Sequence, residues 1–216
     1  MQLGVGKTIF PTWTAAGHLT ASHGADAAQF ALNAARADSN ASRLDFAVRA
    51  MISSDHAVDS SRQLPINWIV PSVAKYQRGF AIARDAVTML VQSGVIPGAR
   101  ERVGRQTLLA AKEYFVEGVA AARVDHSRFS TKLASGWLDA TAEDAVAGVA
   151  LLQPTDSMRR ELIDGIGRMR AAVASRRTID EALVANVTRL FDAAAATLDA
   201  QIVAAEALAA AAAPAA

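Results

Sequence analysis

The sequence predicts an all-α protein: a multi-helix bundle of about six to seven helices with an irregular N-terminal arm and a long C-terminal helix. Alanine, which has the strongest intrinsic helix propensity, supplies 50 of the 216 residues. Aromatic residues make up only 6% of the chain. Apolar residues recur three and four positions apart along most of it, as one face of a helix requires. With 52% hydrophobic residues, the chain is long enough to bury a sizeable core.

Residues 1–24 show no helical period, and we expect an extended arm or irregular loop there. Glycine and proline interrupt this segment at Gly4, Gly6, Pro11, Gly17 and Gly24. Its large apolar residues need cover, because such side chains are rarely left in water. We therefore expect Ile9, Phe10 and Trp13 to pack back on the domain or on a neighbouring molecule.

The helical pattern begins at residue 25 and ends near 38, and a second helix is expected over 41–52. A polar loop rich in serine and aspartate follows over 53–61. The apolar segment 64–71 is bracketed by two prolines. Proline is disfavoured inside regular elements, so this segment is predicted to be a buried extended connector.

Three further features are predicted in the middle of the chain. A helix is expected over 72–93, with Gly94 as its C-terminal cap. The next helix is expected over 99–124, because apolar residues form one stripe along it. A less regular stretch follows over 127–136.

The C-terminal third is predicted to hold a short helix over 142–152 capped by Thr141, a helix over 155–175, and the longest helix over 178–212. The last of these opens with a capping box, Thr-Ile-Asp-Glu. At 1.5 Å per residue it would be about 50 Å long. Because that length exceeds the diameter of a compact body formed by the chain without its arm, we expect part of the helix to project or to pack against another chain.

The chain is accordingly divided into an arm (1–24), a single helical domain (25–212) and a disordered alanine-rich tail (213–216). The start lacks the pattern of a secretory signal peptide. No window reaches the roughly 18 unbroken apolar residues of a transmembrane segment. A cytoplasmic location, or one within a particle assembled there, is the expectation.

Charge is unevenly distributed although the formal net charge is only +1. Residues 61–132 carry eleven basic and five acidic groups, whereas residues 133–216 carry seven basic and eleven acidic groups. This asymmetry predicts self-complementary contacts, within one chain or between copies. The absence of cysteine excludes disulfides, cysteine-ligated zinc, iron–sulfur clusters and thiol nucleophiles.

A glycine-rich motif and the four histidines are possible binding sites by residue type, but neither meets the requirements of such a site. Gly4-Val5-Gly6-Lys7-Thr8 looks like the end of a phosphate-binding loop, but the first glycine of that motif would fall on Met1, with no strand before it. The four histidines, His18, His23, His56 and His126, form no His-x-x-x-His pair. We therefore predict no cofactor and no metal.

The first functional hypothesis is a non-enzymatic assembly protein, a subunit of a homo-oligomer or larger particle, with self-association as its main partnership. Its candidate interface residues are Ile9, Phe10 and Trp13 in the arm and Leu198 and Ile202 in the last helix. An arm with uncovered apolar residues and a helix longer than the body both favour this hypothesis.

Two alternatives remain open. One is a module that binds an anionic polymer or surface, such as nucleic acid, membrane or storage granule, through Arg100, Arg102, Arg105, Arg159 and Arg160; nucleic acid is the less favoured partner, since acidic residues are interspersed. The other is an enzyme whose scattered residues meet only in the fold. Such an enzyme would have a polar pocket lined by several of the following residues: His56, Asp85, Glu113, Tyr114 and His126.

Overall fold

The computed structural model describes residues 6–62, 66–124, 131–150, 156–175 and 179–212. These residues form seven α-helices and no strand. The helices are α1 (Gly6–Arg36), α2 (Asn40–Ser61), α3 (Ile66–Gln92), α4 (Ala99–Val124), α5 (Thr131–Val149), α6 (Asp156–Ala174) and α7 (Glu181–Ala212). The predicted all-α fold with a long C-terminal helix is confirmed.

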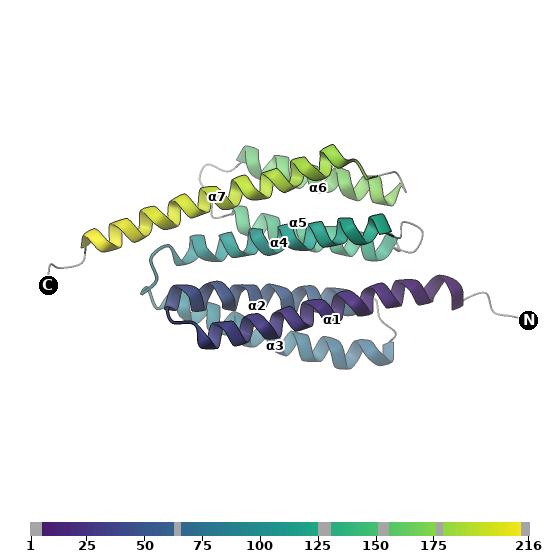
Figure 1. Cartoon of the computed structure of the whole chain (residues 1–216), viewed down its shortest axis with the longest axis horizontal. Coiled ribbons are helices and arrows are strands. Elements are labelled where there is room, and N and C mark those ends of the chain that lie inside the picture. The colour runs from purple at the N-terminus through teal and green to yellow at the C-terminus, as the bar shows by residue number, and fades with distance from the viewer. Residues whose placement is uncertain (1–5, 63–65, 125–130, 151–155, 176–178, 213–216) are drawn as a thin grey trace, which may run out of the picture.

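The helices run roughly along one long axis and form two groups (Figure 1). In the first group, α1 and α3 both pack on α2 and scarcely touch each other. In the second, α4 packs on α5 and α7, while α6 packs on α5 and α7. Helix α2 joins the two groups because its other side packs on α4 and, less extensively, on α5.

Each group has its own hydrophobic cluster. The larger lies among α4, α5, α6 and α7, with Phe115, Leu138, Leu162 and Phe191 among its fully buried side chains. The smaller lies between α2, α3 and α4, around Leu44, Val48 and Ile52. Glycines allow three close helix contacts in the larger cluster, since a Cβ at Gly118, Gly148 or Gly165 would overlap Trp137, Leu108 or Val187 respectively.

The expected arm over 1–24 is corrected by α1, which begins at Gly6. Helix α1 packs along α2, and this tertiary contact overrides the weak local propensity of its glycines. Pro11 is only the sixth residue of the helix, so its missing N–H removes a single backbone hydrogen bond near the end. Residues 1–5 lie outside the described part.

The expected polar loop over 53–61 is also wrong, because α2 continues to Ser61. Its serines are buried, and their small side chains let neighbouring helices approach closely. The Ser61 hydroxyl donates to the carbonyl of Val58, one turn earlier, at 2.7 Å. The serines of this run lie on a buried face of the helix, where a polar composition does not indicate a loop.

Two other predicted boundaries change for related reasons. Helix α3 begins at Ile66, so most of the expected connector over 64–71 forms its first turns. Pro71 is the sixth residue of the helix, so its missing N–H removes a single backbone hydrogen bond near the N-terminal end. Helix α5 runs without a break from Thr131 to Val149. Thr141 does not cap it but lies inside it, where its hydroxyl donates to the carbonyl of Trp137 at 2.9 Å.

Other predictions agree closely with the structure. Helix α4 spans Ala99–Val124 as expected. Gly94 follows α3 with a φ of 67°, a left-handed conformation that favours glycine. At α7 the cap is Asp180, whose carboxylate accepts from the amide of Ala182 at 2.9 Å, whereas Thr178, the first residue of the expected capping box, lies outside the described residues.

The predicted charge complementarity occurs within the chain, where basic α4 lies against acidic α7. Arg105 pairs with Asp199, and Lys112 pairs with Asp192 at 2.5 Å. Arg102 contacts Glu206 at 2.5 Å and Asp45 of α2 at 3.1 Å. These pairs hold the middle and end of the chain together.

Helix α7 is the one described helix that is long and apolar enough to cross a membrane, by length and composition only. Its apolar character comes mainly from alanine, and the core helix of a soluble protein passes the same test. The chain as described packs one side of α7 on α4 and α6.

Candidate functional site

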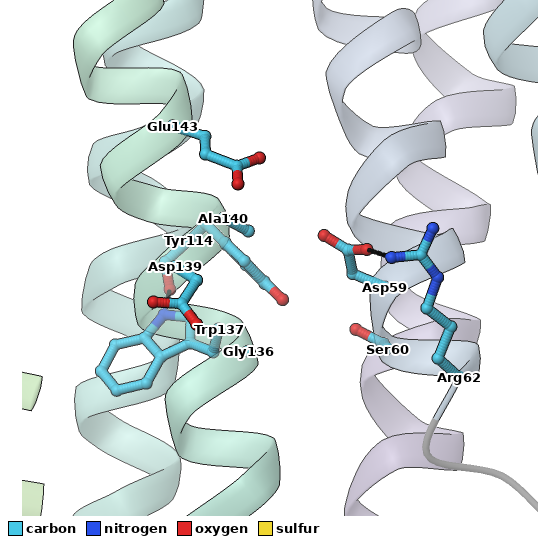
Figure 2. Close-up of a pocket in the computed structure, with 9 residues that line it drawn as sticks. All are labelled: Asp59, Ser60, Arg62, Tyr114, Gly136, Trp137, Asp139, Ala140 and Glu143. Atoms are coloured by element: carbon cyan, nitrogen blue, oxygen red, sulfur yellow. Dashed lines mark hydrogen bonds and ion pairs between the residues drawn. The ribbon is translucent and has the colours of Figure 1, made fainter.

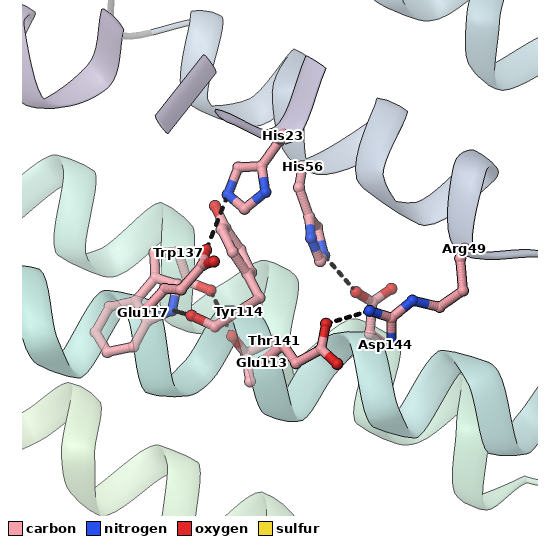
Figure 3. A network of polar contacts seen from close by, with 9 residues as sticks. All are labelled: His23, Arg49, His56, Glu113, Tyr114, Glu117, Trp137, Thr141 and Asp144. Atoms are coloured by element: carbon pink, nitrogen blue, oxygen red, sulfur yellow. Dashed lines mark hydrogen bonds and ion pairs between the residues drawn. The ribbon is translucent and has the colours of Figure 1, made fainter. Parts of the chain in front are cut away.

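A buried polar cluster lies at the junction of the two helix groups (Figure 3). His23 from α1, His56 from α2 and Tyr114 from α4 meet there with their rings in contact. All three side chains are buried. Asp144 from α5 completes the cluster, so that it joins four helices.

His56 has the most constrained position in the cluster. Its Nε2 lies 2.7 Å from Oδ2 of Asp144. Because a carboxylate only accepts, Nε2 carries the hydrogen of this bond. The imidazole also stacks on the Tyr114 ring, with 3.9 Å between centroids and 15° between planes. Burial raises the pKa of Tyr114 well above its usual value, which keeps the phenol neutral.

His23 is buried without a charge. Burial, and secondarily the neighbouring His56, lower its pKa to about 3. Its Nε2 lies 3.5 Å from Glu117 and makes no hydrogen bond among the described residues. Since the imidazole is neutral above about pH 3, this contact is not an ion pair at neutral pH.

The neutral burial of His23 predicts that the protein loses stability in mild acid. Below pH 6.5 the unfolded chain protonates this imidazole, whereas the folded chain does so only near pH 3. The free energy of unfolding should therefore fall by about 2 kcal/mol between pH 7 and pH 5. Urea unfolding at the two pH values measures this difference, and His23→Gln should remove most of it.

Asp55 provides the control for this experiment. Burial and the charges of Asp59 and Asp144 raise its pKa to about 6, which acts in the opposite direction, as the folded state then favours the proton below pH 6. Its burial is only partial, because much of the residue still reaches solvent, and water therefore screens this contribution. Asp55→Asn should therefore retain the acid-induced loss, and an equal loss in His23→Gln and the unaltered protein would contradict the assignment to His23.

The His56–Asp144 pair has the form of a carboxylate-oriented general base, but its surroundings favour a structural role. A general base must come within hydrogen-bond reach of a proton on the substrate. The imidazole is buried, with one face stacked on Tyr114 and Nε2 occupied. Among the described residues, no three histidine, aspartate or glutamate side chains are placed to hold a metal ion.

A pocket of about 260 Å³ opens beside this cluster, between α2 on one side and α4 and α5 on the other (Figure 2). Asp59 and Ser60 enter it from α2, while Tyr114 and Glu143 face them from α4 and α5. The remaining lining residues are Arg62, Gly136, Trp137, Asp139 and Ala140. Burial raises the pKa of Asp59 above its usual value, although the guanidinium of Arg62, 2.8 Å away, acts in the opposite direction.

An apolar groove of about 360 Å³ lies on the opposite side of α2, between α1 and α3. Small residues line most of it, among them Ala27, Ala31, Ala47 and Ala83. Its floor is α2, and its walls are the two helices that scarcely touch each other. Ile82 of α3 lies on its rim with 65% of its surface exposed.

The candidate interface residues have mixed positions. Leu198 and Ile202 are buried within the single chain, where α7 packs on α4 and α6, so they fill the core instead of facing a partner. The side chains of Ile9, Phe10 and Trp13 lie outside the described part of the structure. Among the side chains that the structure describes, the large apolar residues that face solvent are Leu32, Ile82, Met89, Val95, Val116, Val203 and Leu208.

The candidate anion-binding arginines do not form one surface. Arg102 and Arg105 are engaged by carboxylates of α2 and α7. Arg100 is exposed near the start of α4, and Arg159 and Arg160 are exposed on α6, which does not pack on α4. Because Arg102 and Arg105 already pair with carboxylates of the same chain, they are not available to bind an external anion.

The residues named for an unrecognised enzyme site are partly brought together. His56 and Tyr114 stack, and Glu113 lies nearby in an ion pair with Arg49 (Figure 3). Asp85 is exposed on α3, away from the cluster, and His126 lies outside the described residues. His23, Asp144 and Ser60 were not predicted as members of this site, since no local spacing links residues on different helices.

Comparison with protein-family models, curated proteins and solved structures finds no match for this chain.

Proposed function

We propose that the protein is a non-enzymatic assembly protein that associates with a second copy of itself through the face formed by α1 and α3. The observation that supports this most directly is the alanine-lined groove between these helices, with large apolar side chains exposed beside it. Contiguous exposed apolar surface of this kind is typical of interaction sites. This face replaces Leu198 and Ile202, which are buried in the core, whereas Ile9, Phe10 and Trp13 belong to α1 itself.

The face is suited to a twofold-symmetric contact because it has both a projection and a recess. Ile82 and Met89, seven positions apart on α3, project with 65% and 72% of their surfaces exposed. The groove beside them is lined by small side chains. In a symmetric dimer the same patch of each subunit contacts the other, so the projection of one copy can fill the recess of its partner.

The dimensions of the face match those of stable dimers. Helix α3 has 27 residues, and α1 has 31, so each is about 40 Å long or longer. Two such helices side by side, each about 10 Å wide, offer about 800 Å². A standard interface buries about 800 Å² on each partner. Coverage of the α1–α3 face alone would therefore suffice.

Charge reversal of the apolar projection should dissociate the dimer. We expect the unaltered chain of 22.6 kDa to have a native mass of about 45 kDa at micromolar concentration. Ile82→Glu should shift it to the monomer mass, because the substitution would bury an unpaired carboxylate at the contact. Light scattering after size exclusion measures the mass, and circular dichroism checks that the variant is folded.

Leu208→Glu is the matched control for this experiment. Leu208 is also large, apolar and exposed, at 73%, but it lies near the end of α7, away from the proposed face. Its charge variant should keep the dimer mass. A monomeric unaltered chain at high concentration, or equal dissociation by both variants, would refute the proposed interface.

A further inference from the structure

We propose that the pocket between α2, α4 and α5 binds a small organic ammonium compound. The inference is independent of the self-association proposed above, because this pocket and the α1–α3 groove lie on opposite sides of α2. The pocket volume of about 260 Å³ suits a ligand of a few non-hydrogen atoms.

Hydrogen-bond acceptors converge on the pocket from both sides. Figure 2 shows the carboxylate of Glu143 and the phenol of Tyr114 directed toward Asp59 and Ser60 across the space. Asp59 is paired with Arg62, and Asp139 with Arg170 at 3.1 Å. No ion pair occupies Glu143 among the described residues. The pocket therefore has a carboxylate ready for a cationic group.

Ser60 gives the second, independent indication of a ligand. Its side chain is only 1% exposed, and its Oγ faces the Tyr114 phenol but makes no hydrogen bond of normal geometry with any described residue. A buried hydroxyl without a partner is unfavourable, and native proteins rarely leave one unsatisfied. Because Ser60 lines the pocket, a ligand that donates a hydrogen bond there would satisfy it.

The chemistry of the lining distinguishes between classes of ligand. Three carboxylates and one guanidinium give the pocket a net negative charge, which disfavours anions. The described acidic and histidine side chains do not converge closely enough for one metal ion. An alkylammonium group has several donors for separated acceptors, and its hydrocarbon part fits the wall formed by Trp137, Ala140 and Gly136.

Calorimetric titration of the full chain with 1,4-diaminobutane at low ionic strength tests this proposal, with 1,4-butanediol as the uncharged analogue. The diamine should bind saturably at one site per chain, and the diol should not. Glu143→Gln should weaken binding by about tenfold or more, since it removes a charge-assisted hydrogen bond. Ser60→Ala should weaken it severalfold.

Two further variants make the outcome decisive. Gly136→Leu should abolish binding, because a Cβ at Gly136 meets nothing within 4 Å and a larger side chain can extend into the pocket. Glu161→Gln makes the same chemical change on an exposed carboxylate of α6 and should leave binding unchanged. Absence of diamine binding, equal binding of the diol, or unchanged binding in Glu143→Gln would overturn the proposal.

Discussion

Replacement of Gly118 by alanine is expected to lower the free energy of unfolding by about 3 kcal/mol, at the upper end of the usual cost of overpacking a core. At Gly118, helix α4 passes directly over the indole of Trp137, and an added Cβ would overlap atoms Cε2, Cδ2 and Nε1. The indole has little freedom to move. It is buried, its Nε1 donates to the carbonyl of Tyr114 at 2.8 Å, and it stacks on Phe115.

Chemical denaturation monitored by circular dichroism measures this effect, and Gly167→Ala is the matched control. Gly167 lies within α6, is exposed, and has open space where a Cβ would be placed. Its replacement should stabilise the protein by up to about 1 kcal/mol, because alanine favours the helix over glycine. If both variants had similar stability, the close contact between α4 and α5 would be wrong.

Most of the helices could be predicted from the sequence because they begin and end at glycine, proline or capping residues and have a regular apolar stripe between them. Helix α4 begins just after the Pro97-Gly98 pair and has a regular apolar stripe, and its bounds were predicted correctly. The errors lie where polar residues face the protein interior. Ser60 and Ser61 in α2 and Thr141 in α5 are buried between helices, and in a single sequence such residues have the composition of a loop.

The polar cluster could not be predicted, because its contacts depend on how the helices are aligned with one another. The actual partner of His56 is Asp144, 88 positions later. A one-turn shift of α5 along α2 would move this carboxylate by about 5 Å and break the contact. Sequence periodicity identifies the faces of helices but not this relative placement.

His56→Leu is expected to destabilise the protein by about 3 kcal/mol, within the usual cost of removing one partner from a buried ion pair or charged hydrogen bond. The substitution would leave the Asp144 carboxylate facing an apolar side chain. His56 also lowers the pKa of Asp55 and Asp59, which opposes the effects of burial and of the carboxylates on one another.

A double-mutant cycle with Asp144→Asn separates this electrostatic effect from simple loss of packing. If the charge of Asp144 is the main cost, His56→Leu combined with Asp144→Asn should be more stable than His56→Leu alone, by about 1–2 kcal/mol. Urea unfolding of the four proteins at pH 7 gives the coupling energy. Additive losses would mean that His56 contributes only its stacking on Tyr114, and that the contact with Asp144 does not hold α2 to α5.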